Sequence, residues 1–267
     1  MKVHLVDGTY ELFRCYYGAP KRKENGKEVG AARTLGRSLA AWLKTGQVTH
    51  IAYAFDRVIE SFRNDLYTGY KTSEGVEPDL LSQFKLAEET VASLGVTVWP
   101  MIEFEADDAL ATAARRFAKM KAVKQVLICS PDKDLSQCIS GNKIVAYDRF
   151  KDVTLNEKGV IAKFGVPPES IPDLLALVGD TADGIPGIPR WGLKSASTIL
   201  AKYKKLEKIP ARAERWKVLV RGAETLCANL EKNRKDAYLF RKLATVRYDV
   251  PLKEGLREIA WGGRGLV

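Results

Sequence analysis

The amino-acid sequence predicts an α/β protein whose mainly parallel central sheet is flanked by helices and followed by a C-terminal helical module. Short apolar runs of strand length alternate with longer helical patterns over the first two-thirds of the 267 residues. This alternation is typical of a parallel sheet covered on both faces. After about Asp152 the strand signals fade, and helical segments with turns rich in Gly and Pro continue to about Val246.

Five segments have the length and composition of strands: KVHLVD from Lys2, HIAYAFD from His50, VTVWP from Val96, QVLICS from Gln125 and KIVAYD from Lys143. Four of them are largely continuous in apolar residues, as buried parallel strands tend to be. His4 lies within the first strand, so we expect its side chain to be part of the packing and not to bind a ligand.

The segments between these strands predict helices over residues 30–45, 78–94 and 105–120. In the helix expected over residues 105–120, apolar residues recur on one face. Trp42 lies on a face of the helix expected over residues 30–45, where we expect it to pack. Residues 21–27 are rich in Lys and Arg and predict an exposed loop. We place a boundary near Ile171–Asp173, which gives an α/β domain over residues 1–172 and a helical module over residues 173–267 that packs on the sheet domain.

Charge is concentrated in the second of these parts. Residues 173–267 hold 19 Lys and Arg against 11 Asp and Glu, a net charge of +8, out of +10 for the whole chain. A basic module of this kind is expected where phosphates are neutralised, although a solvated basic surface has the same composition.

Other bulk properties exclude several classes of protein. No apolar run is long enough to span a membrane, and the start of the chain has the pattern of a strand, not of a secretory signal. Four cysteines without paired spacing and only two histidines make disulfides and a zinc site improbable. We therefore expect a cytoplasmic protein that makes no membrane contact and is a monomer.

Acidic residues mark the ends of the expected strands. Asp7 and Asp56 end the first two strands. The third strand is followed by Glu105, Asp107 and Asp108, and the fourth by Asp132 and Asp134. Asp180 and Asp183 lie at the start of the helical module. Because the carboxyl ends of parallel strands meet at one edge of a sheet, we expect these acids to converge on one crevice.

Such a cluster predicts divalent metal ions. Two like charges about 4 Å apart repel by about 4 kcal/mol at an effective dielectric constant of about 20, so these carboxylates cannot share a crevice as bare anions. Mg²⁺, or Mn²⁺ as a substitute, prefers oxygen ligands. Two such ions about 4 Å apart activate a water and stabilise a leaving oxygen, which predicts metal-assisted hydrolysis of phosphodiesters.

Each acid also has a purely structural explanation. Asp7–Gly8 fits an ordinary turn, acids in the first turn of a helix are favoured by the helix dipole, and Asp132 and Asp134 could cap a loop. A purely structural reason for an acid at every strand end is much less expected than a structural reason for an acid at any one strand end. The functional interpretation therefore depends on the whole set.

Two basic segments predict contact with nucleic acid. The segment GIPGIPRWGLKSASTILAKY combines a Gly/Pro hairpin with a helix start, which is a common phosphate-binding arrangement; its candidate residues are Gly187, Gly192, Lys194, Ser195 and Lys202. The segment FRNDLYTGYK follows Asp56 and offers Arg63 and Lys71 as clamps for a phosphate and Tyr70 for stacking on a base. Ordinary turn chemistry and surface packing are the structural alternatives.

These motifs, together and in order, resemble the 5′-nuclease family, which includes the 5′–3′ exonuclease domain of bacterial DNA polymerase I and the flap endonucleases. The resemblance runs from Val3 to about Pro251 and rests on LVDGTYELFR, THIAYAFD, FRNDLYTGYK, EADD, DKDL, KFGVPPESIPDLLALVGDTADGIPG and RKLATVRYDVPL. It implies a PIN-like nuclease fold with a helix–hairpin–helix-like module, and DNA with 5′ ends, flaps, nicks or branches as the partner.

The resemblance also implies roles for single residues. It implies one metal-ligand group of Asp7, Asp56, Glu105, Asp107 and Asp108, and a second of Asp132, Asp134, Asp180 and Asp183. Lys71 and Arg63 match basic active-site residues of the family, and Tyr70 matches a stacking aromatic residue. Residues 184–203 match the duplex-binding element, in which relatives often hold K⁺ on hairpin carbonyls.

Three positions depart from the family pattern. Glu74 stands near the place of a further Arg, Arg190–Trp191 replaces the common Gly–Ile of the hairpin, and Pro131 stands where Gly is usual. The first departure concerns the handling of flaps, and the second the geometry of the hairpin and its K⁺. No polymerase sequence follows Val267, so we expect a stand-alone nuclease.

The expected activity is that of a metal-dependent 5′–3′ exonuclease or flap endonuclease that hydrolyses DNA. Two alternatives remain open at this point. A PIN-type ribonuclease would also use acids at strand ends, and a branched-DNA-binding protein that has lost catalysis would keep the basic module.

Overall fold

A computed structural model describes residues 1–262 of the chain. Its central sheet has six strands in the order β5-β4-β1-β6-β7-β8, parallel throughout except for the antiparallel pair β7 and β8. The strands are β1 (Lys2–Asp7), β4 (Ile51–Asp56), β5 (Thr97–Met101), β6 (Gln125–Cys129), β7 (Ile144–Asp148) and β8 (Val153–Leu155). The fold class and the five expected strands are confirmed.

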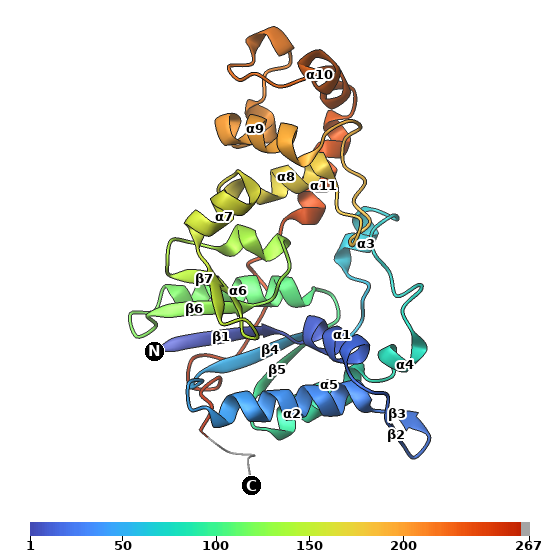
Figure 1. Ribbon diagram of the computed structural model, residues 1–267, viewed down its shortest axis with the longest axis vertical. Coiled ribbons are helices and arrows are strands. Elements are labelled where there is room, and N and C mark those ends of the chain that lie inside the picture. The colour runs from blue at the N-terminus through green and yellow to red at the C-terminus, as the bar shows by residue number, and fades with distance from the viewer. Residues whose placement is uncertain (263–267) are drawn as a thin grey trace.

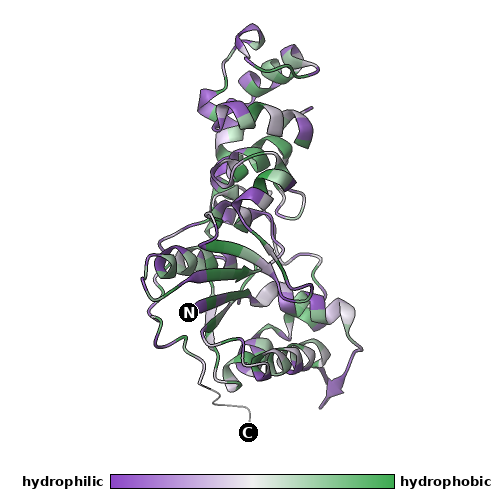
Figure 2. Cartoon of the chain, turned by 60° about the vertical axis from the view of Figure 1, so that its left-hand side comes forward, coloured by the Kyte–Doolittle hydropathy of each residue, from purple (hydrophilic) through white to green (hydrophobic). Residues whose placement is uncertain are grey.

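Helices cover both faces of this sheet (Figure 1). Val6, Tyr53 and Phe55 point to one face, where they pack with α1 (Gly8–Gly18), α2 (Gly30–Lys44) and α5 (Phe84–Ser93). Leu5 and its neighbours of the opposite parity pack against α6 (Ala106–Ala118) on the other face. The two buried faces explain why the strands are continuously apolar (Figure 2).

The expected helix over residues 78–94 is two helices, α4 (Pro78–Leu81) and α5. The break lies at Gln83, which is fully buried. Its side-chain oxygen accepts the amide protons of Ala31 and Ala32 at 3.0 and 3.1 Å, and its amide nitrogen donates to Asp79. Gln83 thereby satisfies the free N–H groups at the start of α2, and this tertiary contact outweighs the helical pattern.

Residues 21–27 are exposed as expected, but they form a hairpin instead of a loop. Strands β2 (Lys23–Glu24) and β3 (Lys27–Glu28) pair antiparallel around Asn25 and Gly26. Both turn residues have positive φ values, 51° and 77°, as a two-residue hairpin turn requires.

The second part of the chain is helical, and it stacks on the sheet domain through a continuous apolar core (Figure 1). Its helices are α7 (Glu157–Phe164), α8 (Ile171–Val178), α9 (Leu193–Tyr203), α10 (Ala223–Lys232) and α11 (Arg234–Ala244), with single 3₁₀ turns at Pro168–Ser170, Leu206–Lys208 and Ala213–Arg215. Two smaller elements lie near the sheet edge, α3 (Phe62–Leu66) and the 3₁₀ turn Asp134–Cys138.

The chain after α11, which is the last part of the expected module of residues 173–267, returns to the sheet domain. Ala260 bridges to His50 beside β4, and the indole N–H of Trp261 donates to Leu94 at 2.8 Å. Trp99 Nε1 donates to Glu254 at 2.9 Å. Residues 246–262 therefore hold the far side of the α/β domain, and residues 263–267 of the expected module lie outside the described part of the chain.

Two further expectations concern packing and membranes. His4 is buried between Trp42 and Tyr147, with ring centroids 5.3 and 6.3 Å away, and burial lowers its pKa to about 4; its predicted packing role is confirmed. All four cysteines are buried and free. Within residues 1–262, every helix falls short of the length and apolarity needed to cross a bilayer.

Candidate metal centre and nucleic-acid interface

The predicted acids gather along the carboxyl edge of the sheet. Asp7 ends β1 and starts α1, where its Oδ1 accepts the amide proton of Tyr10 at 2.8 Å. Ser130, which follows β6, donates its hydroxyl to Asp7 Oδ2 at 2.8 Å. Burial raises the pKa of Asp7 to about 7, and the nearby charges of Asp56 and Asp132 act in the same direction. Asp7 is therefore fixed in place by two donors while it faces other acids.

Asp56 and Asp107 complete this side of the edge. Asp56 ends β4, and its Oδ1 accepts from the amide of Ala106 at the start of α6 at 2.7 Å. Burial raises the pKa of Asp56, with Glu105 adding to the rise. Burial also holds the pKa of Asp107 well above its usual range, and repulsion from Asp132 and Asp7 contributes. The acids of separate strands thus lie close enough to raise one another's pKa values.

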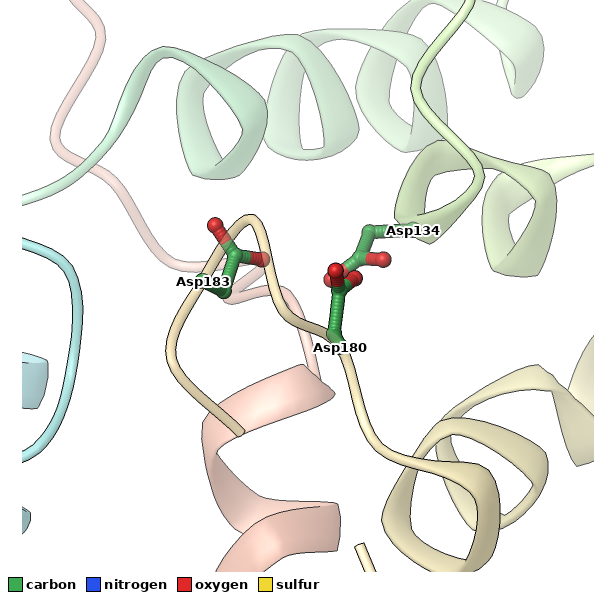
Figure 3. Close-up of side chains that lie close together, drawn as sticks. All are labelled: Asp134, Asp180 and Asp183. Atoms are coloured by element: carbon green, nitrogen blue, oxygen red, sulfur yellow. The ribbon is translucent and has the colours of Figure 1, made fainter. Parts of the chain in front are cut away.

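Three carboxylates form the tightest group. One oxygen from each of Asp134, Asp180 and Asp183 lies within 4.8 Å of the others, with the carboxylates of Asp134 and Asp180 directed toward each other (Figure 3). All three residues are buried, and Asp134 Oδ1 has no hydrogen-bond partner. Burial and the neighbouring acids Asp132 and Asp183 raise the pKa of Asp134 well above its usual range.

A buried carboxylate oxygen without a partner needs a cation or a proton. The fourth acid of this expected group, Asp132, is exposed, and its Oδ1 accepts from the amide of Asp134 at 2.8 Å. The donors are carboxylate oxygens throughout, which fits hard divalent cations. In residues 1–262, the acids of the other expected group form no equally close set of three.

Two lysines neutralise part of the cluster. Lys71 Nζ lies 2.9 Å from Glu105 Oε2 and 3.0 Å from Asp183 Oδ1. Lys133 Nζ lies 2.6 Å from Asp180 Oδ2. Burial of Glu105 acts to raise its pKa, but Lys71 and Arg63 outweigh it and hold the value at about 2. Lys71 therefore lies inside the crevice, as the sequence predicted.

The structure gives Arg63 and Asp108 other roles than the expected phosphate clamp and metal ligand. Arg63 is 2% exposed and Asp108 is fully buried. Their side chains form a bidentate pair, with both N–O distances 2.8 Å. Arg63 also donates to Glu105 and to the backbone oxygens of Leu243 and Thr245.

The oxygens of Asp108 are fully used as well. They accept from the backbone amides of Glu105 at 3.0 Å and Arg247 at 2.7 Å in addition to Arg63. Neither side chain has capacity left for a phosphate or a metal ion. The pair instead joins α3, α6 and the chain after α11 beneath the crevice.

Tyr70 is also placed differently from the expected base-stacking position. Its ring belongs to the apolar core at 4% exposure, and its hydroxyl donates to Glu105 Oε2 at 3.2 Å. Both ring faces are covered, so a base cannot stack on it in this conformation. Tyr70 orients Glu105 instead.

The hairpin between α8 and α9 is well formed despite its Arg190–Trp191 sequence. Arg190 has φ 72°, the left-handed conformation that Gly usually supplies. Trp191 is buried, donates its indole N–H to Leu226 at 3.0 Å and packs 6.1 Å from Trp216. The tryptophan thus ties the hairpin to α10, and the K⁺ that the resemblance implies here stays a prediction.

Close backbone packing fixes Gly187, because a Cβ there would lie 2.5 Å from the Gly179 nitrogen. This glycine supports the hairpin from inside and does not face solvent. The expected candidates at the helix start and end are accessible to different degrees: Gly192, Lys194 and Lys202 are exposed, and Ser195 is partly buried.

The start of α9 carries no acid in its first turn. Ser195 Oγ accepts from the amide of Gly192 and donates to its carbonyl oxygen, at 3.2 and 2.9 Å. Lys194 is exposed and is the second residue of α9, in the turn whose N–H groups have no partner within the helix. Lys204 and Lys205, by contrast, pair with Glu169 and Asp173, so the exposed cations of the helix are Lys194 and Lys202.

Three polar residues of the site were missed by sequence reasoning. Ser130 and Ser61 donate to Asp7 and Glu105 at 2.8 and 2.7 Å, and Lys133 pairs with Asp180. Ser61 is recognisable as the N-cap of α3, whereas nothing in the sequence indicated the partner of Lys133. A cleft of about 390 Å³ opens beside Asp7 and is lined in part by Asp132, Lys133 and Lys163; we call it the Asp7 cleft.

Two family models match the chain. The model of the 5′–3′ exonuclease N-terminal resolvase-like domain matches residues 2–165, and that of the 5′–3′ exonuclease C-terminal SAM fold matches residues 166–264. The chain is 35% identical over 249 residues to a 5′–3′ exonuclease of Buchnera aphidicola subsp. Baizongia pistaciae, covering 92% of this chain and 82% of that one.

A second relative is much longer. DNA polymerase I of Rhizobium leguminosarum is 38% identical over 258 residues, which is 93% of this chain and 25% of the polymerase. The chain thus spans about a quarter of the length of this relative.

Solved structures share the fold. T5 5′-exonuclease with bound zinc ions superposes with a TM-score of 0.73 at 18% identity, covering 91% of this chain and 89% of that one. The catalytic core of Rad2 in complex with DNA substrate gives 0.61 at 14% identity, covering 99% and 83%. On the two matching models and the Buchnera relative, this chain belongs to the 5′–3′ exonuclease family.

Proposed function

We propose that this chain is a metal-dependent 5′–3′ exonuclease and flap endonuclease that hydrolyses DNA phosphodiester bonds at 5′ ends and at branched duplexes. The observation that carries the proposal is the close group of Asp134, Asp180 and Asp183, in which one oxygen of Asp134 is buried without a partner. The printed names support the substrate class, since one relative is a 5′–3′ exonuclease and one structure of the same fold is a catalytic core in complex with DNA substrate.

Two divalent ions, Mg²⁺ or Mn²⁺, fit the donors of the crevice. Asp7, Asp56 and Asp107 would hold one ion and Asp132, Asp134, Asp180 and Asp183 the other. Glu105 would join the first group when Lys71 and Tyr70 release its Oε2. When bound, such ions supply an activated water and stabilise the leaving oxygen. Ser130 and Tyr70 fix the orientation of Asp7 and Glu105, which keeps the ligands in place before the ions bind.

Lys71 is the side chain best placed to act on the scissile phosphate. Its ammonium group bridges the two ligand groups at Glu105 and Asp183, and its side chain is 29% exposed. A cation in this place stabilises charge that develops on the phosphate in the transition state. Arg63, by its buried pairing, takes no part in this step.

Lys71→Ala is expected to lower the single-turnover cleavage rate by about 10²-fold and DNA binding by only a few-fold. Rapid-quench digestion of a 5′-labelled flap, with binding measured separately in Ca²⁺, checks the two effects. Lys85→Ala on α5, whose side chain is 82% exposed, serves as the control. A normal single-turnover rate in Lys71→Ala would remove this role.

The helical module would hold the duplex. The start of α9 offers backbone N–H groups together with Lys194, and contacts of this kind bind phosphate without reading sequence. Lys194→Ala is therefore expected to weaken binding to all duplex sequences alike and to reduce the slope of log K against log salt by about 1. Fluorescence anisotropy at several salt concentrations measures this slope, which Lys85→Ala should leave unchanged; an unchanged slope in Lys194→Ala would exclude it from the phosphate contacts.

Digestion of matched substrates tests the proposed activity. A 5′-labelled flap, a nicked duplex and a blunt duplex, each as DNA and as RNA, should be cut only as DNA, with products released from the 5′ side. Preferential cleavage of RNA would favour the PIN-type ribonuclease instead. Tight binding of the flap without any cleavage in Mg²⁺ or Mn²⁺ would favour the inactive DNA-binding protein.

A further inference from the structure

We propose that Lys133 is a built-in competitor of a divalent ion: its ammonium group neutralises Asp180 in the metal-free protein and must leave this carboxylate when the ion binds. The inference rests on the proposed metal site and adds to it a residue that sets the affinity of one ion. Lys133 lies between two acids of the DKD motif, Asp132 and Asp134, but it pairs with neither of them.

The pairing of Lys133 is specific. Its Nζ lies 2.6 Å from Asp180 Oδ2, and Asp180 is only 4% exposed. The other oxygen of Asp180 accepts from the amide of Ala182 at 3.1 Å. The lysine therefore occupies the oxygen of Asp180 that has no backbone donor.

The same carboxylate belongs to the tightest acidic group of the described chain. Oxygens of Asp134, Asp180 and Asp183 lie within 4.8 Å of one another, and Asp134 Oδ1 is buried without a partner. An ion shared by these three residues meets the ammonium group at Asp180. Because two cations at one carboxylate repel each other, binding of the ion displaces the lysine.

Displacement is feasible because of where Lys133 lies. Its side chain is 38% exposed, and it lines the Asp7 cleft together with Lys163. A rotation about its flexible stem moves the ammonium group from Asp180 into this cleft. Lys71 differs, since it bridges two carboxylates, Glu105 and Asp183, and so loses two ion pairs if it moves.

Titration with Mn²⁺ tests the inference without DNA and without cleavage. Free Mn²⁺ is followed by electron paramagnetic resonance, and Asp180→Asn identifies the class of site that contains Asp180. Lys133→Met keeps the apolar stem and removes the charge. This substitution should raise the Mn²⁺ affinity of the sites that contain Asp180 on the order of tenfold, the effect of removing one charged hydrogen bond. The Mn²⁺ affinity of any other class of site should not change.

Two control variants separate competition from net charge. Lys133→Arg keeps a cation within reach of Asp180 and should bind Mn²⁺ within about twofold of the natural protein, since the ion pair is preserved. Lys163→Met removes the same charge from the same cleft, and in residues 1–262 Lys163 forms no ion pair with an acid. Its Mn²⁺ affinity should therefore stay close to that of the natural protein.

Thermal unfolding gives a second measurement. Without metal, Lys133→Met leaves buried Asp180 without its cation and should unfold at a lower temperature. In saturating Mn²⁺ the difference in unfolding temperature should disappear. Adding the ion should therefore raise the unfolding temperature of this variant by more than that of the natural protein.

The outcomes distinguish the inference from the proposed function. Unchanged Mn²⁺ affinity in Lys133→Met, weaker affinity, or equal tightening in Lys163→Met would each overturn the competition, while Mn²⁺ binding by the natural protein would leave the proposed function standing. Absence of any Mn²⁺ binding by the natural protein would overturn both.

Discussion

Replacing Asp107 by Asn is expected to lower DNA cleavage by about 10²–10³-fold or more while it makes the metal-free protein more stable. The loss of activity is the size expected when one essential electrostatic group is removed from an active site. The gain in stability follows from the crevice, where burial and the charges of Asp132 and Asp7 hold the pKa of Asp107 well above its usual range. An amide at this position removes that repulsion.

The gain should depend on pH in a defined direction. A raised carboxyl pKa means that the folded protein binds protons more readily than the unfolded chain, so metal-free stability falls as the pH rises through the titration range. For Asp7 this range runs from its usual 3.8 to about 7. The stabilisation by Asp107→Asn should therefore be smallest at acid pH, where this carboxyl group is protonated in both the folded and the unfolded state, and it should grow as the pH rises.

Thermal unfolding in EDTA at several pH values measures this stabilisation. We expect the unfolding temperature to rise by about 2–4 °C for each 1 kcal/mol of added stability. Glu103→Gln removes an exposed acid from the loop before α6 and should change neither stability nor cleavage. DNA binding by Asp107→Asn should stay within a few-fold. Equal losses of binding and cleavage, or a lower unfolding temperature in EDTA at pH 8, would contradict the assignment of Asp107 as a metal ligand.

Replacing Arg63 by Met is expected to destabilise the protein by about 3–5 kcal/mol, the usual cost of leaving one partner of a buried ion pair without the other. Asp108 would remain fully buried beside Glu105 without its bidentate partner. The second substitution Asp108→Asn should recover much of this loss, because no uncompensated charge remains at that position.

Urea unfolding of the single and double variants measures these differences. The double variant also tests the role of Asp108: if the carboxylate is structural, Arg63→Met/Asp108→Asn should still cleave a 5′ flap in Mg²⁺. If Arg63→Met were as stable as the natural protein but failed to cleave, Arg63 would be a catalytic residue and the buried pair would not be its role.

The strand and acid pattern predicted the fold and the place of the site because both follow from periodic physical rules. Buried parallel strands must be apolar on both faces, and their carboxyl ends must share an edge. Asp7 and Asp56 could therefore be placed together from sequence alone, although 48 residues lie between them. The family motifs added the order of the remaining acids.

Pairing partners could not be predicted in the same way. Whether Arg63 faces a phosphate or Asp108 depends on the side-chain geometry of three elements that the sequence pattern leaves open. Tyr70 and Gln83 are similar cases. The burial of Tyr70 and the helix break at Gln83 both arise from contacts with distant segments. The return of residues 246–262 to the sheet lacks a periodic signal altogether.

One measurement tests most directly whether cleavage depends on the carboxylate crevice. Release of a labelled 5′ flap is followed in Mg²⁺, then in excess EDTA, and again after Mg²⁺ is restored. We expect cutting in Mg²⁺, none in EDTA and full recovery when Mg²⁺ returns, because the acids cannot hold or activate the reactants alone. Cleavage of the same flap at an equal rate in EDTA would contradict the metal-dependent mechanism.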